Sequence, residues 1–362
     1  MTYKKKICLE KSMITSTSNQ QMKNLMLLMK KAKARNEQEL FVVEGRKMFQ
    51  EVPEEWLKQV YVSESFFAEN DKMLAGYTYE IVSDSVFKAV SDTQTPQGIL
   101  CLVRKPQYRL EELLKGADTH LLILESIQDP GNLGTMLRTG EGAGISGVVM
   151  NHTTVDLFNP KTIRSTMGSI YRMPFFVTRD LEETICELKN AGVKTYAAHL
   201  KGKMQYDEPD YTGATAFMIG NEGNGLSDEI ADLADTYIKI PMCGQVESLN
   251  AAISASLLMY ETNRQRRIRS MSQGRMRIWF KMMKDNHLLR DTTITDESDD
   301  TRTHKIFRAI DEVCYAFDLG KPIWLDVNVA EFKRHAKTRF TRDSFIESID
   351  FDFLEMHVIE ED

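Results

Sequence analysis

The chain has 362 residues, of which 42% are hydrophobic and 27% are charged, a composition typical of globular domains. Its formal net charge of −7 argues superficially against a nucleic-acid partner, but the distribution of charge matters more than its sum. No apolar run is long enough to cross a bilayer, so no membrane span is predicted, and the length predicts two or three domains.

Cysteine and histidine usage bears on compartment and on metal binding. The five cysteines are scattered, odd in number and without CxxC spacing, which indicates reduced thiols and not a disulfide framework or a zinc site. The seven histidines are equally dispersed, so no metal site is predicted. Residues 1–6 lack the apolar stretch of a signal peptide, which predicts a cytoplasmic protein.

Basic residues gather at the amino end of the chain. Residues 1–50 hold eleven Lys/Arg and four Glu, whereas residues 271–362 hold fourteen basic and nineteen acidic residues. Ser18-Asn19 can cap a helix, because apolar residues follow at helical spacing (Met22, Leu25, Met26 and Met29). The other side of this helix carries several lysines and Arg35, and is either a solvated face or a surface that contacts phosphates.

The first hundred residues alternate strand-like and helix-like segments. Short apolar runs at 41–43, 60–62 and 98–103 predict strands, and a helix is expected near 83–90. This alternation predicts a small α/β domain over residues 1–105, and its basic end makes it the candidate RNA-binding domain.

Residues 118–268 repeat a strand–loop–helix pattern, which predicts a parallel sheet with helices on both faces. Polar or glycine-rich loops, at 129–134, 220–227 and 242–250, follow three of the predicted strands. Because the carboxyl ends of parallel strands meet at one edge of a sheet, we expect a site built from these loops. The last helix is expected over about 247–267, with Ser248 as a natural N-cap.

A small α+β extension is predicted over residues 271–362. Residues 301–317 have the apolar stripe of an amphipathic helix, and residues 351–358 alternate as a strand does. No catalytic constellation is visible there. The extension is interpreted as a fused, formerly independent small protein, which either binds a partner or covers a surface.

The glycine-rich turn at 220–225 is a weak signal when it is taken alone. It is not a P-loop, because no Gly-Lys-Ser/Thr follows it, and the first strand of this domain lacks the GxGxxG of a dinucleotide site. The signal comes from an ordered set of motifs. These are Asn132 and Arg138 after the first strand, Asn221-Glu222-Gly223 after a late strand, and Ile240-Pro241 with Ser248-Leu249-Asn250 after the last.

This set resembles that of the SpoU/TrmH-type RNA ribose 2′-O-methyltransferases of the SPOUT superfamily, over roughly residues 14–268. The resemblance implies S-adenosyl-L-methionine as the cofactor, a trefoil knot over about 215–260 and a homodimer through the knot region. It implies nothing for residues 271–362. The positions that match the family's cofactor contacts are Asn151, Gly220, Ile240 and Leu249.

The implied reaction requires help, because a ribose hydroxyl is a poor nucleophile until it loses its proton. Arg138 matches the family's essential arginine, which has been assigned as the base. Because an arginine is effectively always protonated, we favour a guanidinium that grips the target phosphate and stabilises the developing alkoxide, in cis or in trans. Asn132 is expected to orient Arg138, and Glu222 to hold Arg138 or the ribose. Ser248 and Asn250 are expected to hydrogen-bond the nucleotide or the cofactor.

The expected function is therefore S-adenosylmethionine-dependent 2′-O-methylation of structured RNA. Ribosomal RNA is favoured over tRNA because the chain has a separate amino-terminal domain, which tRNA-modifying members of the family often lack. From another class, a non-catalytic RNA-binding factor for ribosome assembly on the same fold remains an alternative.

Overall fold

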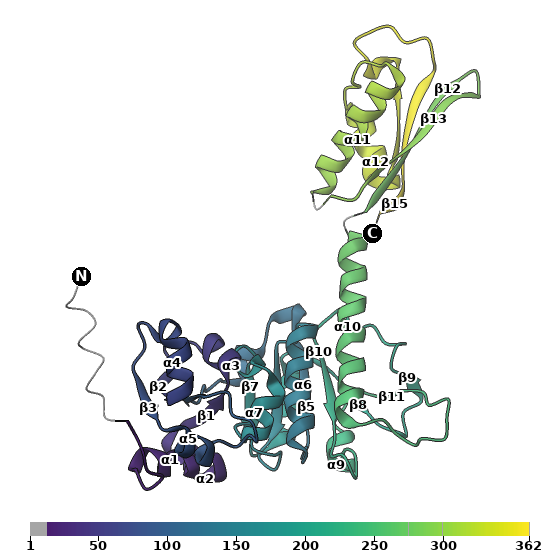
Figure 1. Cartoon of the computed structure of the whole chain (residues 1–362). Helices are drawn as coiled ribbons and strands as arrows, with labels where there is room; N and C mark the ends of the chain where they lie inside the picture. Colours follow the sequence, from purple (N-terminus) through teal and green to yellow (C-terminus); the bar gives the residue numbers. More distant parts are fainter. Residues whose placement is uncertain (1–12, 274, 299, 362) are drawn as a thin grey trace, which may run out of the picture. The chain divides into compact units, whose positions relative to one another are not determined.

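The computed structural model describes residues 13–273, 275–298 and 300–361, and the chain divides into two compact units, Met1–Asn263 and Arg264–Asp362 (Figure 1). Cys8 and the residues examined for a signal peptide lie outside the described part. The first unit contains a four-stranded and a seven-stranded sheet, and the second contains another four-stranded sheet. Helix α10 (Ala251–Gln273) runs across the division between the units.

The amino-terminal sheet has the strand order β1-β4-β2-β3 and is covered by helices on both faces. Asn19 caps the first helix by accepting a hydrogen bond from the Gln21 N–H, as the sequence predicted. The elements are β1 (Leu40–Glu44), β2 (Leu57–Ser63), β3 (Tyr79–Val82), β4 (Ile99–Arg104), α1 (Gln20–Lys30), α2 (Ala32–Gln38), α3 (Arg46–Glu51), α4 (Glu64–Asn70) and α5 (Asp84–Val90).

The seven-stranded sheet is parallel throughout and has the order β7-β6-β5-β10-β8-β11-β9. Its central strands β5 and β10 are buried along their whole length, so the predicted parallel sheet with helices on both faces is confirmed. The strands are β5 (His120–Leu124), β6 (Gly147–Asn151), β7 (Phe175–Thr178), β8 (Lys194–Ala198), β9 (Met204–Gln205), β10 (Thr215–Ile219) and β11 (Thr236–Lys239).

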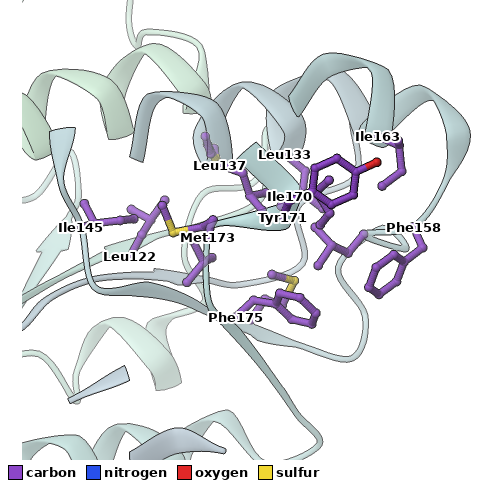
Figure 2. Close-up of a cluster of buried hydrophobic side chains, with 14 of the residues drawn as sticks. Leu122, Leu133, Leu137, Ile145, Phe158, Ile163, Ile170, Tyr171, Met173 and Phe175 are labelled. Carbon is purple, nitrogen blue, oxygen red and sulfur yellow. The ribbon is translucent and has the colours of Figure 1, made fainter. Parts of the chain in front are cut away.

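Helices α6 and α10 pack on one face of this sheet, and α8 and α9 pack on the other. Figure 2 shows Leu133 and Leu137 of α6 in one buried cluster with Leu122 of β5. Gly134 permits α7 to approach α6 closely, because a Cβ at this position would lie 2.4 Å from the Cβ of Ser165. The remaining helices are α6 (Pro130–Ala143), α7 (Pro160–Thr166), α8 (Leu181–Asn190) and α9 (Asp228–Ala231), with 3₁₀ turns at Asp71–Leu74, Leu110–Leu113, Gly116–Asp118, Ser169–Tyr171 and Arg342–Ser344.

The start of the last helix of this domain differs from the prediction. Helix α10 begins at Ala251, and Asn250 supplies the cap, because its Oδ1 accepts hydrogen bonds from the N–H groups of Ala252 (2.8 Å) and Ile253 (3.3 Å). Ser248 is exposed and lies in the preceding loop, so its prediction as the N-cap was wrong. Asparagine and serine cap helices about equally well, so local preference could not choose between them.

Arg35 was predicted on an exposed basic face, and this was wrong. Its side chain is only 3% exposed, and its guanidinium donates to the Asp156 carboxylate from Nε (2.8 Å) and from Nη2 (2.5 Å). Two half-exposed ion pairs, Arg164 with Asp92 and Arg172 with Glu51, also join the amino-terminal domain to the domain of the parallel sheet. Removal of Asp156 would leave the buried Arg35 charge without its carboxylate, so this pair is the most costly of the three to break.

The carboxyl-terminal unit is an antiparallel sheet of order β13-β12-β15-β14 with two helices on one face. The predicted helix at 301–317 is confirmed as α11, which Thr301 caps. The predicted strand at 351–358 is confirmed as β15, which begins two residues later and ends three residues later than predicted. The elements are β12 (Met276–Lys284), β13 (His287–Asp296), β14 (Lys337–Thr341), β15 (Phe353–Glu361), α11 (Arg302–Phe317) and α12 (Asp326–His335).

The other face of this sheet has one buried carboxylate among three cations. Glu355 is 4% exposed, and it pairs with Lys281 (3.1 Å), Lys337 (3.0 Å) and Arg339 (3.0 Å). Burial alone would raise the pKa of Glu355, but the three cations outweigh burial and lower it from 4.5 to about 2. The stabilisation is therefore present above pH 4.5 and is lost as pH falls from 4.5 towards about 2.

Replacing Glu355 by Gln is expected to destabilise the second unit by about 3 kcal/mol at pH 7, because three partly buried cations lose their partner. The difference should shrink as pH falls below 4.5, since the carboxylate of the unfolded wild-type chain then takes up a proton while that of the folded chain stays charged down to about pH 2. Denaturant unfolding of the full chain at pH 7 and at pH 3 measures both effects. Glu360→Gln, which removes a half-exposed partner of Arg275 and Arg277, is the control. An equal loss at both pH values would contradict the assignment.

Candidate active site

The predicted site loops leave the parallel sheet at its carboxyl edge. Strands β5 and β10 are direct neighbours, with Leu124 opposite Ile219, and β11 lies one strand beyond β8 on the same side. The loop after β10 is tied to the loop after β5, because Ser227 donates to the Glu125 carboxylate from its N–H (2.8 Å) and from its hydroxyl (2.6 Å). The edge therefore gathers the three motifs that the sequence places far apart.

Glu222 is the centre of the hydrogen bonding among these loops. Its carboxylate accepts from the N–H of Gln128 (2.9 Å), the N–H of Asp129 (3.0 Å) and the side-chain amide of Asn132 (3.0 Å). The Asn132 oxygen in turn accepts from the side-chain amide of Asn250 (3.0 Å). Three predicted catalytic residues, Glu222, Asn132 and Asn250, thus form one polar chain, which we call the edge network.

The edge network keeps Glu222 ionised. Burial alone would raise its pKa, but hydrogen bonds from Asn132 and from the N–H groups of Gln128 and Asp129 outweigh burial and hold the pKa below its ordinary value. Glu222 is therefore a carboxylate near neutral pH, and it fixes positions as an acceptor. It does not carry a proton.

Arg138 lies on the exposed side of α6, about 9 Å further along the helix axis than Asn132 at the usual rise per residue. Within the described part of the chain, no hydrogen bond or ion pair reaches its guanidinium. The sequence led us to expect that Asn132 orients Arg138 and that Glu222 holds it or the ribose. The structure instead pairs Asn132 with Glu222 and leaves the guanidinium to face solvent.

The four positions assigned to the cofactor lie on the same edge. Gly220 is buried at the end of β10, and Ile240 and Leu249 are half-buried at the two ends of the loop after β11. The side chain of Asn151 is occupied by other loops, because its oxygen accepts from Ser126 N–H (2.8 Å) and its amide donates to the Ser126 hydroxyl (3.0 Å). Ile240 and Leu249 can cover an adenine ring, while the backbone of the loop between them offers polar groups to its edge.

The sequence assigned no chemistry to Asn221, and the structure gives it a role in shaping the turn. Its side-chain oxygen accepts from the N–H groups of Gly223 (2.8 Å) and Asn224 (3.2 Å), and its amide donates to the Ser126 carbonyl (2.9 Å). Its signal was its place within the glycine-rich turn, since asparagine commonly organises such turns through its side chain. Ser248 is exposed, and in the described structure it takes no part in the edge network.

Gly220 is required because the turn folds back on itself. A Cβ at this position would lie 2.0 Å from the Gly225 carbonyl carbon and 2.0 Å from the Leu226 nitrogen, and backbone atoms cannot move aside. Gly220→Ala is expected to lower the free energy of unfolding by about 3 kcal/mol. It should also abolish binding of S-adenosylmethionine, which calorimetry measures.

Gly223→Ala is the matched control within the same turn. The nearest atom to a Cβ there is Asn221 Oδ1 at 3.4 Å, which is an ordinary contact. This variant should unfold and bind S-adenosylmethionine as the wild type does. Equal behaviour of the two variants would contradict the structure of the turn.

Family models match both domains of the first unit. Residues 119–260 match the SpoU rRNA methylase family, and residues 19–101 match the MRM3-like substrate binding domain. The 23S rRNA (guanosine(2553)-2′-O)-methyltransferase RlmP of Bacillus subtilis (strain 168) is 35% identical to this chain over 249 residues, which are 68% of this chain and 97% of that protein.

Solved structures agree with these matches. An AdoMet-bound rRNA methyltransferase from Sinorhizobium meliloti aligns with a TM-score of 0.63 at 28% identity, covering 70% of this chain and 97% of that chain. An RNA 2′-O ribose methyltransferase aligns with a TM-score of 0.61 at 31% identity, covering 70% and 99%. The fold and the site thus define a parallel-sheet, AdoMet-dependent RNA methyltransferase. The chain belongs to the SpoU rRNA methylase family.

No group of His, Cys, Asp or Glu side chains among the described residues could hold a metal ion. No helix in the described ranges is long and apolar enough to cross a membrane.

Proposed function

We propose that this protein transfers a methyl group from S-adenosylmethionine to a ribose 2′-oxygen of ribosomal RNA in the cytoplasm. The observation that carries the proposal is the edge network of Glu222, Asn132 and Asn250, at the same carboxyl edge of the sheet as the loops of the SpoU motifs. The choice of ribosomal RNA is supported by the relative named as a 23S rRNA methyltransferase and by the match of residues 19–101 to a substrate-binding domain.

In this proposal the cofactor residues, Arg138 and the edge network have different roles. When bound, S-adenosylmethionine supplies an electrophilic methyl group, and the backbone at Gly220 with the side chains of Ile240 and Leu249 would hold it. The free guanidinium of Arg138 grips the target phosphate and stabilises negative charge on the 2′-oxygen. The edge network keeps the loops at fixed positions, so that the hydroxyl and the methyl group meet in line.

The proposal also includes two features of the architecture. We propose that residues of about 215–260 form a trefoil knot. This is supported by the strand order, in which β10 enters between β5 and β8, and by α10 returning to the core beside α6. We also propose three domains, at 1–105, 118–268 and 271–362, which is supported by the three separate sheets.

A homodimer through the knot region is supported by an apolar stripe on α10. Ile253, Leu257 and Tyr260 follow each other at helical spacing and are 50%, 37% and 49% exposed, whereas Ala255 and Leu258 on the other side are buried. A stripe of this kind on a helix indicates a contact with another protein surface. A second copy covers it with the same stripe, as a two-fold axis requires.

Leu257→Glu is expected to convert the dimer to a monomer, because a charge would be buried at the centre of the stripe. Sedimentation equilibrium measures the mass directly. Leu27→Glu, at a residue of α1 that is 46% exposed, should leave the mass of the dimer unchanged. A wild-type monomer, or a dimer that survives Leu257→Glu, would overturn this part of the proposal.

Mapping of 2′-O-methylation across cellular RNA, with and without the gene, tests the proposed substrate. The expected result is one or more ribosomal positions that lose their methyl group when the gene is absent. Loss confined to tRNA would replace the substrate. No change in any RNA, together with no binding of S-adenosylmethionine by calorimetry, would favour a non-catalytic assembly factor.

A further inference from the structure

A cavity of about 680 Å³ lies between the amino-terminal domain and the β6–β7 side of the parallel sheet. Helix α2 and the segment after β4 line it from one domain. Strand β7 and the loop after β6 line it from the other. The volume suits a small organic ligand. The edge network, Gly220, Ile240 and Leu249 do not line the cavity, whereas Asn151, the fourth position assigned to the cofactor, does.

Aromatic rings form the floor of the cavity. The rings of Phe158 and Phe175 lie 5.7 Å apart, and Tyr108 stacks edge-on against Phe175 at 5.3 Å. Figure 2 shows Phe158 and Phe175 together at one end of the core. The ammonium group of Lys105 lies 4.7 Å above the Phe158 ring. Phe158 and Phe175 are only 4% and 6% exposed, so they support the half-buried Tyr108 ring, and a flat ligand would meet that ring and the apolar stem of Lys105.

The rim of the cavity carries amides and a carboxylate. Gln107 donates to Glu39 (2.8 Å), and Lys105 donates to the Asn36 oxygen (2.6 Å). In the described structure, these bonds leave the Asn36 amide N–H groups and the Gln107 oxygen without partners. The rim thus presents donors and acceptors side by side.

Charge decides which class of ligand suits the cavity. Lys105 is the lining cation, and burial lowers the pKa of its ammonium group. Glu39 and Asp156 also line the cavity, and the Asp156 carboxylate is held by Arg35. A phosphate would meet two carboxylates here, so the lining favours a neutral, planar ligand with polar edges.

We propose that this cavity receives one unpaired base of the substrate RNA. The inference rests on the proposed function for the identity of the ligand, since bases in single-stranded RNA are read by stacking on aromatic side chains and by hydrogen bonds to their edges. The amino-terminal domain, which matches a substrate-binding domain over residues 19–101, borders the cavity.

The cavity is coupled to the edge network through the loop after β6. Asn151 lines the cavity and holds Ser126, and Gln128 donates to the Thr153 carbonyl (3.1 Å) while its N–H donates to Glu222 (2.9 Å). A base in the cavity would thus contact the loop after β6, which is hydrogen-bonded to the loops that position Asn132. The cavity selects which RNA is methylated.

The test uses the full-length protein and ribosomal RNA transcribed without modifications. Gln107→Ala removes a rim amide, and Val177→Trp fills the cavity from an edge-strand position that is 49% exposed, so the fold can accept it. Val177→Trp is expected to raise KM for RNA by about ten-fold or more, which is the contribution of one stacked base. Gln107→Ala is expected to raise KM by roughly three- to ten-fold, which is the contribution of one hydrogen bond. Gln38→Ala, on α2 but outside the cavity lining, should leave KM unchanged.

Three further readouts make the result specific. Affinity for S-adenosylmethionine should be unchanged in both variants, and the salt dependence of RNA binding should keep its slope, because no phosphate contact is lost. Wild-type KM in both variants, or a parallel loss of cofactor affinity, would overturn the inference. If the wild type transfers no methyl group, equilibrium binding of the same RNA to wild type and variants still decides whether the cavity holds a base.

Discussion

Arg138→Ala is expected to reduce methyl transfer to RNA by roughly 10²- to 10³-fold, which is the usual effect of removing one group that stabilises charge in a transition state. Stability should not change, because the side chain is exposed and, among the residues that the structure describes, contacts no partner. Arg138→Lys retains the charge but loses the paired donors, so it should recover only part of the activity. Single-turnover transfer of a labelled methyl group measures all three proteins.

The same variant can decide whether Arg138 serves its own site or the site of a partner. If Arg138 serves the site of the partner subunit, a mixture of the Arg138→Ala and Glu222→Gln proteins should regain activity, because each mixed dimer then contains one intact site. If Arg138 serves its own site, both sites of the mixed dimer lack one group and the mixture should stay inactive. Wild-type turnover by Arg138→Ala alone would contradict any catalytic role for this guanidinium.

Glu222→Gln is the second change with a large expected effect. A carboxylate accepts three N–H groups at this point, from Gln128, Asp129 and Asn132, and an amide would turn its own NH₂ toward one of them. Because Glu222 is exposed and water can compensate, the loss of stability should be only about 1 kcal/mol. The loss of methyl transfer should be about a hundred-fold, since Asn132 and the start of α6 lose their fixed positions.

A matched control for this change lies in the neighbouring helix. Glu229→Gln alters the same charge on α9, at an exposed residue outside the edge network, and should leave activity unchanged. Steady-state kinetics with thermal unfolding of both variants separates the two effects. If Glu222→Gln kept its activity while Glu229→Gln lost it, the edge network would not be the site.

The sequence predicted the parallel sheet because its central strands are continuous apolar runs, which is the pattern of strands buried on both faces. It could not predict the strand order. Strands β5 and β10 are neighbours although more than ninety residues separate Leu124 from Ile219, and nothing in either run marks the other as its partner. The extension was predicted as α+β for a similar reason, since α11 and β15 have clear periodic patterns.

The site residues were predicted from motifs, and their contacts were not. The sequence treated Arg35 as one charge on a basic face, because its partner Asp156 lies 121 residues away. It likewise placed the start of α10 at Ser248, when Asn250 makes the cap and also reaches Asn132. The contacts of such side chains depend on residues that are far away in the sequence. Periodicity and local preference carry no information about these contacts.

The central claim is that the protein methylates a ribose 2′-oxygen of ribosomal RNA. The most direct measurement is transfer of a labelled methyl group from S-adenosylmethionine to unmodified ribosomal RNA, followed by the same assay on RNA with a single 2′-deoxy nucleotide at the position found. We predict one equivalent of methyl group on the first RNA and none on the second. Methyl transfer that persists on the 2′-deoxy RNA would contradict the claim.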